Sequence, residues 1–173
     1  MAKSGAILIL ASALCLLSLL NLAECHDQFF VEGSVYCDTC RTQFMTRLSR
    51  FVAGATVRLE CKEAESGKVT LSKEAVTDGS GGYSVEIEGD REDESCEVVL
   101  VKSSDPECSE IDASSFGTQA AKVSVTRNNG IVSPVRSANP LGFLRNQPLP
   151  ECGAVLQELH LAADPLSDDD PLD

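Results

Sequence analysis

Short runs of alternating apolar and polar residues recur along the chain and are the main indication of its fold. Alternation with a period of two residues is typical of a β-strand that buries one face. Turn-forming residues separate the runs, as they do in proteins built from strands alone. The pattern predicts an all-β fold, a small sandwich or barrel of about six or seven strands. The expected strands cover residues 29–36, 55–61, 68–76, 83–88, 96–102 and 121–127.

Two of these runs alternate cleanly enough to indicate which side chains face the core. In 55–61 and 83–88 every second residue is apolar, and the residues between them are polar or charged. The run 96–102 is almost continuously apolar and therefore suits a central strand. The residues expected to point inward are Ala55, Val57, Leu59, Cys61, Tyr83, Val85 and Ile87.

Glycine and asparagine mark the expected turns. Residues 78–82 read Asp-Gly-Ser-Gly-Gly, and residues 128–130 read Asn-Asn-Gly. Glycine reaches positive φ without steric penalty, so both segments predict tight turns. Between them, 89–94 is mostly charged and should form a solvated loop.

Three other segments lack strand periodicity. In 41–52 apolar residues recur at helical spacing. We expect a loop or short helical turn that closes the end of the sandwich. The alternative is an amphipathic helix that binds a partner. Segment 132–150 contains four prolines, which cannot donate to a strand ladder, and is expected to be an irregular loop. After Cys152, three apolar residues predict a short C-terminal helix: Val155, Leu156 and Leu159.

The two ends of the chain are expected to lie outside the folded domain. Lys3, an apolar run over 6–20 and small residues after it form a signal-peptide pattern, too short to span a membrane. We expect cleavage after Cys25, with Ala23 as the alternative. The acidic segment 163–173 lacks the apolar content to fold and should be a disordered tail. Residues 26–162 then form one β domain.

The cysteines indicate a disulfide framework. Of the eight, Cys15 and Cys25 fall in the expected signal peptide, and six remain. An even number in an exported chain implies bridges, although spacing leaves their pairing open. The C-x-x-C pair Cys37 and Cys40 could also be a dithiol redox centre or half of a zinc site. The all-β surroundings and the scattered positions of the other cysteines favour structural bridges.

Charge and composition exclude several classes of function. A formal net charge of −13 disfavours nucleic acid and anionic membranes as partners. The two histidines, His26 and His160, belong to no catalytic signature, and the chain has no tryptophan to serve as a sugar platform. We therefore expect no catalytic residue, no cofactor and no metal, and the protein is interpreted as non-enzymatic, with a secreted hydrolase as a distant alternative.

One region runs against the acidic composition. Arg41, Arg47, Arg50 and Arg58 lie within an 18-residue span that contains no acidic residue. They could bind an acidic protein surface or a polyanionic wall polysaccharide. The alternative, which we favoured, is that they pair with the chain's own carboxylates.

The sequence resembles a family of plant proteins. Residues 32–41, Glu-Gly-Ser-Val-Tyr-Cys-Asp-Thr-Cys-Arg, resemble the signature of the Ole e 1-like family, named after the major olive pollen allergen. The resemblance includes all six cysteines in order and spans nearly all of the expected mature chain. It continues through residues 54–61, 77–78, 82–83, 139–143 and 150–152.

The resemblance implies a secreted plant protein with a small β-barrel or sandwich, also similar to transthyretin-like folds. It implies the pairs Cys37–Cys108, Cys40–Cys152 and Cys61–Cys96. Members are not known as enzymes; some are linked to pollen tube growth, one type as a receptor-kinase ligand, and others to cell walls. We therefore expect an extracellular interaction or signalling protein whose partner is a plant cell-surface receptor or another wall protein. The alternative is a structural wall protein that binds acidic polysaccharide.

Overall fold

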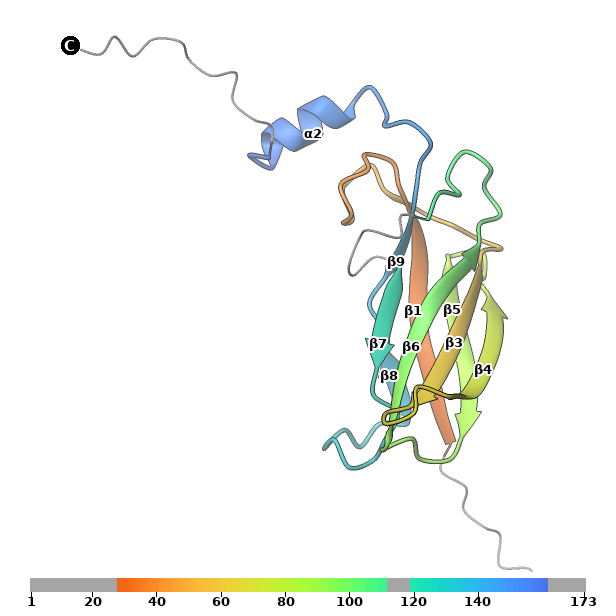
Figure 1. Ribbon diagram of the computed structural model, residues 1–173. Coiled ribbons are helices and arrows are strands. Elements are labelled where there is room, and N and C mark those ends of the chain that lie inside the picture. The colour runs from red at the N-terminus through yellow and green to blue at the C-terminus, as the bar shows by residue number, and fades with distance from the viewer. Residues whose placement is uncertain (1–27, 112–118, 162–173) are drawn as a thin grey trace, which may run out of the picture.

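The computed structural model describes residues 28–111 and 119–161, so the expected signal peptide, His26 and the acidic tail lie outside the described residues. The described chain forms two β-sheets and one short helix (Figure 1). The strands are β1 (Gln28–Asp38), β2 (Arg50–Phe51), β3 (Thr56–Glu63), β4 (Val69–Val76), β5 (Gly82–Glu88), β6 (Glu94–Lys102), β7 (Ala120–Val123), β8 (Val135–Ser137) and β9 (Leu141–Leu144), and the helix is α2 (Cys152–Glu158).

Strand β1 organises the five-stranded sheet because each half of it has neighbours on both sides. Its first half pairs antiparallel with β5 and parallel with β8. Its second half pairs antiparallel with β2 and parallel with β9. Four strands from distant parts of the chain are therefore aligned on one eleven-residue strand.

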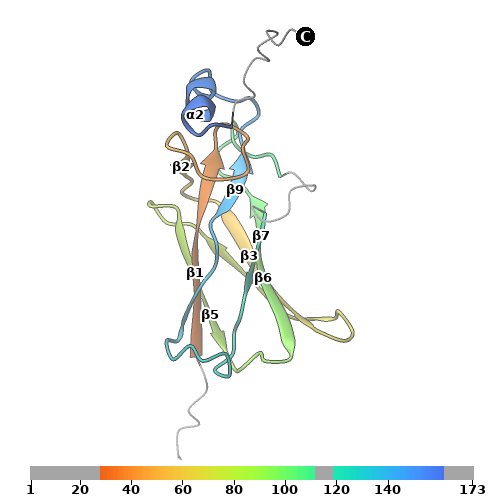
Figure 2. The same cartoon turned by 90° about the vertical axis from the view of Figure 1, so that its left-hand side faces the viewer.

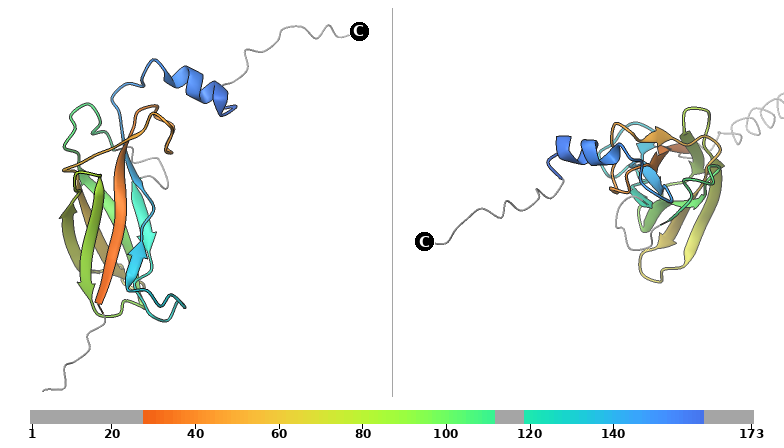
Figure 3. Two further views of the ribbon diagram at one scale, coloured as in Figure 1. Left: turned by 180° about the vertical axis from the view of Figure 1, so that it is seen from behind. Right: turned by 90° about the horizontal axis from the view of Figure 1, so that it is seen from above.

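The other sheet has four strands in the order β4-β3-β6-β7, all antiparallel. Strand β6 lies between β3 and β7, which confirms the central position expected for the apolar run 96–102. The two sheets face one another as layers, and α2 lies beyond one end of them (Figures 2 and 3). The architecture is a sandwich rather than a closed barrel, within the range that the sequence predicts.

The core lies between the layers and follows the predicted alternation. On β3, Val57, Leu59 and Cys61 are completely buried, while the polar residues between them are half-buried. The seven residues expected to point inward are all buried. Aliphatic side chains supply most of this core, joined by Phe29 and Phe143.

The prediction for 132–150 was wrong, because this segment contains β8 and β9. The prolines lie at the strand boundaries rather than inside them: Pro134 precedes β8 and Pro140 precedes β9. Proline lacks an N–H but keeps its carbonyl, and the Pro134 carbonyl accepts a hydrogen bond from Phe30. Strand β9 is buried along its whole length, so tertiary pairing with β1 determines its conformation.

The segment 41–52 is a loop followed by the two-residue strand β2, as favoured, and the alternative helix is not formed. It does not close the sandwich with its large apolar residues, since Phe44, Met45 and Phe51 are exposed. Strand β7 is shorter than expected and ends at Val123, although Val125 beyond it is still buried. The described residues contain nine strands instead of six or seven because β2, β8 and β9 are short.

No helix in 28–111 or 119–161 has the length and apolar character needed to cross a bilayer.

Candidate functional site: the disulfide-tethered end

Two disulfides join three separate segments at the end of the sandwich where α2 lies. Cys37, near the end of β1, is bonded to Cys108 in the loop after β6. Cys40, three residues later, is bonded to Cys152, the first residue of α2. The two sulfurs of the C-x-x-C pair therefore serve different partners. We call this region, residues 39–50, 103–110 and 145–158, the tethered end.

The third disulfide lies inside the core. Cys61 on β3 and Cys96 on β6 are direct cross-strand partners, with 4.0 Å between their Cα atoms. The three pairs are those that the resemblance implies. Among the described residues, one group of potential metal ligands comes together, Cys61, Glu94 and Cys96, and both of its sulfurs are in this disulfide.

The buried carboxylate of Asp38 explains how Cys37 and Cys40 diverge within one turn. Its Oδ1 accepts a hydrogen bond from the Cys40 N–H at 3.1 Å, and its Oδ2 accepts one from the Gln43 N–H at 2.6 Å. Arg41 and Gln43 have φ values of 56° and 64°, which L-residues adopt only when the surroundings impose them. The carboxylate therefore holds the chain in a tight reversal immediately after β1.

Thr39 connects the same turn to the other segments of the tethered end. Its hydroxyl donates to the Leu48 carbonyl at 3.0 Å. Its own carbonyl accepts from the Leu149 N–H at 3.0 Å and lies 3.5 Å from the Cys152 sulfur. Asp38 and Thr39 are thus both required by the geometry between the two cysteines, a role that the sequence analysis missed.

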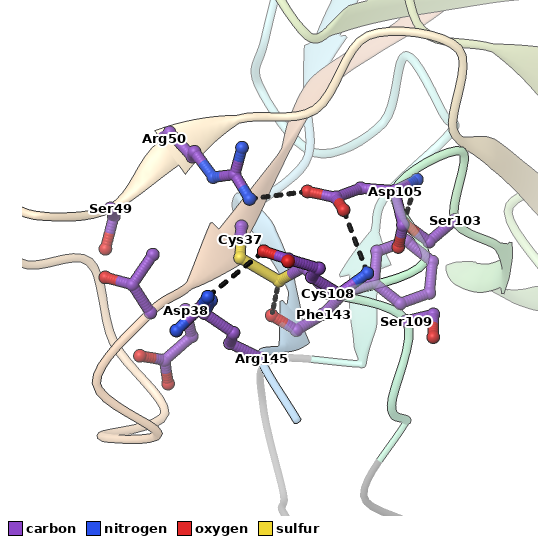
Figure 4. The surroundings of a disulfide bond; sticks show 12 residues. Cys37, Asp38, Ser49, Arg50, Ser103, Asp105, Cys108, Ser109, Phe143 and Arg145 are labelled. Atoms are coloured by element: carbon purple, nitrogen blue, oxygen red, sulfur yellow. Dashed lines mark hydrogen bonds and ion pairs between the residues drawn. A yellow bond between two sulfur atoms is a disulfide. The ribbon is translucent and has the colours of Figure 1, made fainter. Parts of the chain in front are cut away.

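The Cys37–Cys108 disulfide is surrounded by polar contacts from both segments that it joins (Figure 4). Arg50 on β2 forms an ion pair with Asp105 at 2.6 Å. The other carboxylate oxygen of Asp105 accepts the Glu107 N–H at 3.0 Å, which shapes the turn before Cys108. The Cys108 sulfur lies 3.3 Å from the carbonyl of Phe143 on β9.

Besides Arg50–Asp105, three arginine–carboxylate pairs connect the three segments of the tethered end. Arg41 binds Glu110 through both terminal nitrogens, at 2.6 and 2.7 Å, and so links the same two segments as Cys37–Cys108. Arg47 binds Glu158 through two nitrogens at 3.0 Å and links the same segments as Cys40–Cys152. A third pair, Arg145–Glu107, joins the remaining two segments.

In the structure, the arginines of the expected positive region are paired with carboxylates of the same chain. Arg41, Arg47 and Arg50 lie together at the tethered end, but each has a carboxylate partner within the chain. Arg58 is elsewhere, on β3, and pairs with Glu60 and Glu74. The positive charge of this sequence segment is neutralised by carboxylates from other segments, in agreement with the pairing expected from the sequence.

The Arg47–Glu158 pair is the most solvated of these pairs and is accessible to a partner. The Arg47 and Glu158 side chains are 55% and 58% exposed. Hydrogen bonding to Arg47 lowers the pKa of Glu158, and the same contact raises the pKa of Arg47. Exposed pairs of this kind contribute little to folding stability.

Exposed apolar side chains flank these arginines. Phe44 and Met45 lie between Arg41 and Arg47 on the loop, and Phe51 follows Arg50 directly. Aromatic residues, methionine and arginine are the side chains enriched in protein interfaces. Leu159, which follows Glu158, adds another exposed apolar group beside the Arg47 ion pair.

An open depression of about 420 Å³ also belongs to the tethered end. It is lined by Glu107, Arg145, Asn146, Gln147, Pro148 and Pro150. A larger depression of about 690 Å³ lies near the opposite end, between the β3–β4 and β5–β6 loops, and its lining is mainly acidic.

Comparison with known proteins identifies the family of the chain and agrees with its fold. Residues 27–160 match the family model described as "Pollen protein Ole e 1 like". The chain is 53% identical to the "Olee1-like protein" of Betula pendula over 164 residues, 95% of this chain and 98% of that protein. It is 44% identical to "Anther-specific protein LAT52" of Solanum lycopersicum over 155 residues, 89% and 94% of the two chains.

A solved structure shows the same similarity. The crystal structure of the major plantain pollen allergen Pla l 1 superposes with a TM-score of 0.65 at 42% identity, covering 72% of this chain and 99% of that one. These three relatives are named as an Olee1-like protein, an anther-specific protein and a pollen allergen, and none of the names describes an enzyme. By this match over most of its length, the chain belongs to the Ole e 1-like family of pollen proteins.

Proposed function

We propose that the protein is a secreted, non-enzymatic interaction protein of the plant extracellular space. It acts in pollen tube or tissue growth. Its tethered end binds a cell-surface receptor or another extracellular protein. Three disulfides support an oxidising, extracellular setting. Relatives named as pollen-specific and anther-specific proteins support a role in pollen or anthers.

One observation carries the choice of surface. Phe44 and Met45 are 39% and 43% exposed on a loop that two disulfides and several ion pairs hold in place. A loop held in this way loses little conformational entropy on binding, so its exposed apolar groups can contribute fully to affinity. The adjacent arginines add orientation through contacts with acidic groups of the partner.

The alternative partner is an acidic wall polysaccharide bound through the arginines. Two features weigh against it. Arg41, Arg47 and Arg50 already have carboxylate partners within the chain. The overall charge of −13 would also repel a polyanion.

The test compares binding of the labelled mature protein to germinated pollen tubes. We expect saturable binding that unlabelled protein displaces, and a loss of roughly tenfold or more in affinity for Phe44→Ser/Met45→Ser. The matched control is Val69→Ser, which replaces an apolar residue of similar exposure on β4 in the other sheet. Non-saturable binding, or equal losses for both variants, would contradict the proposal.

A column of polygalacturonate tests the alternative. Under our proposal the wild-type protein passes through at moderate salt, and Arg47→Gln/Arg50→Gln behaves in the same way. Salt-sensitive retention that this double variant abolishes, and that the control Arg58→Gln on β3 preserves, would support the polysaccharide instead.

A further inference from the structure

We infer that Asn129, in the loop after β7, is a site of spontaneous deamidation that converts an amide of the folded protein into a carboxylate. This reaction needs an asparagine whose side-chain carbonyl carbon can be attacked by the backbone nitrogen of the next residue. A following glycine favours the attack because it has no Cβ to obstruct it and adopts many backbone conformations. Asn129 is followed by Gly130.

The structure leaves the attacking nitrogen available. The Gly130 N–H donates to no residue within the described part of the chain. A Cβ built at Gly130 would meet nothing within 4 Å, so no neighbouring atom crowds the Gly130 backbone. Asn129, Gly130 and their neighbours Asn128 and Ile131 are all exposed, which admits water for the hydrolytic step.

Two hydrogen bonds define the position of the Asn129 side-chain amide. The Asn129 Oδ1 accepts a hydrogen bond from the Ile131 N–H at 3.0 Å, so its side chain folds back across residue 130. This hydrogen bond also withdraws electron density from the amide carbonyl. On the other side, Nδ2 donates to the Ser124 hydroxyl at 3.0 Å, which keeps the amide in this orientation.

The chemistry balances with water as the only co-reactant. The Gly130 nitrogen loses its proton and attacks Cγ of Asn129, and ammonia leaves with that proton to give a succinimide. Water then opens the ring at either carbonyl. One opening gives aspartate with an unchanged main chain, and the other gives isoaspartate, which lengthens the main chain by one methylene.

The site lies where a new negative charge has local consequences. The neighbouring Asn128 donates its amide to Glu92, and Asp90 accepts the Arg127 N–H at 3.0 Å. A carboxylate at 129 would repel these acidic groups and weaken the contact between the loop after β7 and the loop after β5. The same change replaces the amide donor to Ser124 with an acceptor.

The experiment incubates the intact mature protein at mildly alkaline pH and follows each asparagine by peptide mass spectrometry. We expect Asn129 to convert roughly tenfold faster than Asn128 and Asn146. Asn139 should not convert, because Pro140 has no N–H to attack with. These residues are internal controls in the same sample.

Two variants and one peptide complete the test. Asn129→Gln should abolish conversion at this position, and Asn129→Asp supplies the product for comparison of thermal stability. A synthetic peptide of residues 124–135 gives the rate without tertiary structure. A folded-state rate far below that of the peptide, or conversion at Asn128 and Asn146 as fast as at Asn129, would overturn the inference.

Discussion

The ring of Tyr83 on β5 lies directly over the backbone of Gly33 on β1, its cross-strand partner. A Cβ added to Gly33 would overlap the tyrosine hydroxyl and approach Cζ within 2.6 Å. Tyr36 on β1 covers Gly142 on β9 in the same way, and a Cβ added to Gly142 would lie 2.6 Å from the Tyr36 Cζ. Each glycine leaves space for a large ring on the neighbouring strand, so the two pairs help to set the register of β1.

We therefore expect Gly33→Ala to lower the free energy of unfolding by about 1–3 kcal/mol, because the tyrosine must leave its position. Urea denaturation followed by circular dichroism measures this change. Gly79→Ala is the matched control, since a Cβ there meets nothing within 4 Å and no positive φ is involved, and it should change stability little. A Gly33→Ala protein as stable as this control would contradict the packing argument.

The pKa values of Tyr36 and Tyr83 should lie well above that of an ordinary phenol. Burial raises the pKa of Tyr83 to about 12, and burial together with the charge of Asp38 raises the pKa of Tyr36 to about 12. Because the chain contains two tyrosines and no tryptophan, phenolate absorbance reports on these residues alone. A transition near pH 10 in the native protein would contradict the structure.

The sign of the accompanying stability change follows from the direction of the shift. Between pH 10 and 12 the unfolded tyrosines lose their protons and the folded ones keep them, so stability falls as pH rises through this window. The loss should reach about 2 kcal/mol per tyrosine. Tyr83→Phe should remove its share of this loss without destabilising the protein at neutral pH, because the Tyr83 hydroxyl has no hydrogen-bond partner among the described residues.

Asp38→Ala should destabilise the tethered end. The substitution leaves the buried N–H of Cys40 and the N–H of Gln43 without their acceptor, and we expect a loss of about 2–4 kcal/mol. The control is Asp78→Ala, where an exposed carboxylate accepts similar bonds from Ser80 and Gly82 and water can replace it, so the loss should be clearly smaller. Equal losses in urea denaturation would mean that the burial of Asp38 has no energetic role.

Arg136 on β8 should be important for stability although it pairs with no carboxylate among the residues described. It is 3% exposed, its guanidinium lies 4.8 Å from the Phe29 ring centre, and it donates to the Thr126 carbonyl at 2.7 Å and the Ile131 carbonyl at 3.3 Å. Arg136→Met removes these donors from the loop that follows β7. We expect a loss of about 2–4 kcal/mol and faster amide exchange in 126–135.

Arg127→Met provides the control for that substitution. Its guanidinium also faces Phe29, but at 6.0 Å and from an exposed position. A loss of under about 1 kcal/mol is expected. If Arg127→Met were the more damaging change, the carbonyl contacts of Arg136 would not be the stabilising interaction.

The parts of the fold that depend on local pattern could be predicted from the sequence. Alternation placed β3 and β5 and identified their inward residues, and the apolar run over 96–102 identified β6 as central. The apolar spacing after Cys152 predicted α2. These features could be predicted because a strand or helix that buries one face must repeat its apolar residues with its own period.

Tertiary structure decided the rest. Strands β8 and β9 are too short to show a period, and they form because β1 offers them hydrogen-bonding partners. The arginines of 41–50 form a basic cluster in sequence, but Glu110, Glu158 and Asp105 reach them from segments that are distant along the chain. Thr39 binds Leu48 nearby, but its carbonyl also accepts the Leu149 N–H, which only the folded chain brings to it. Pairing and neutralisation depend on which residues become neighbours, and the one-dimensional pattern does not contain that information.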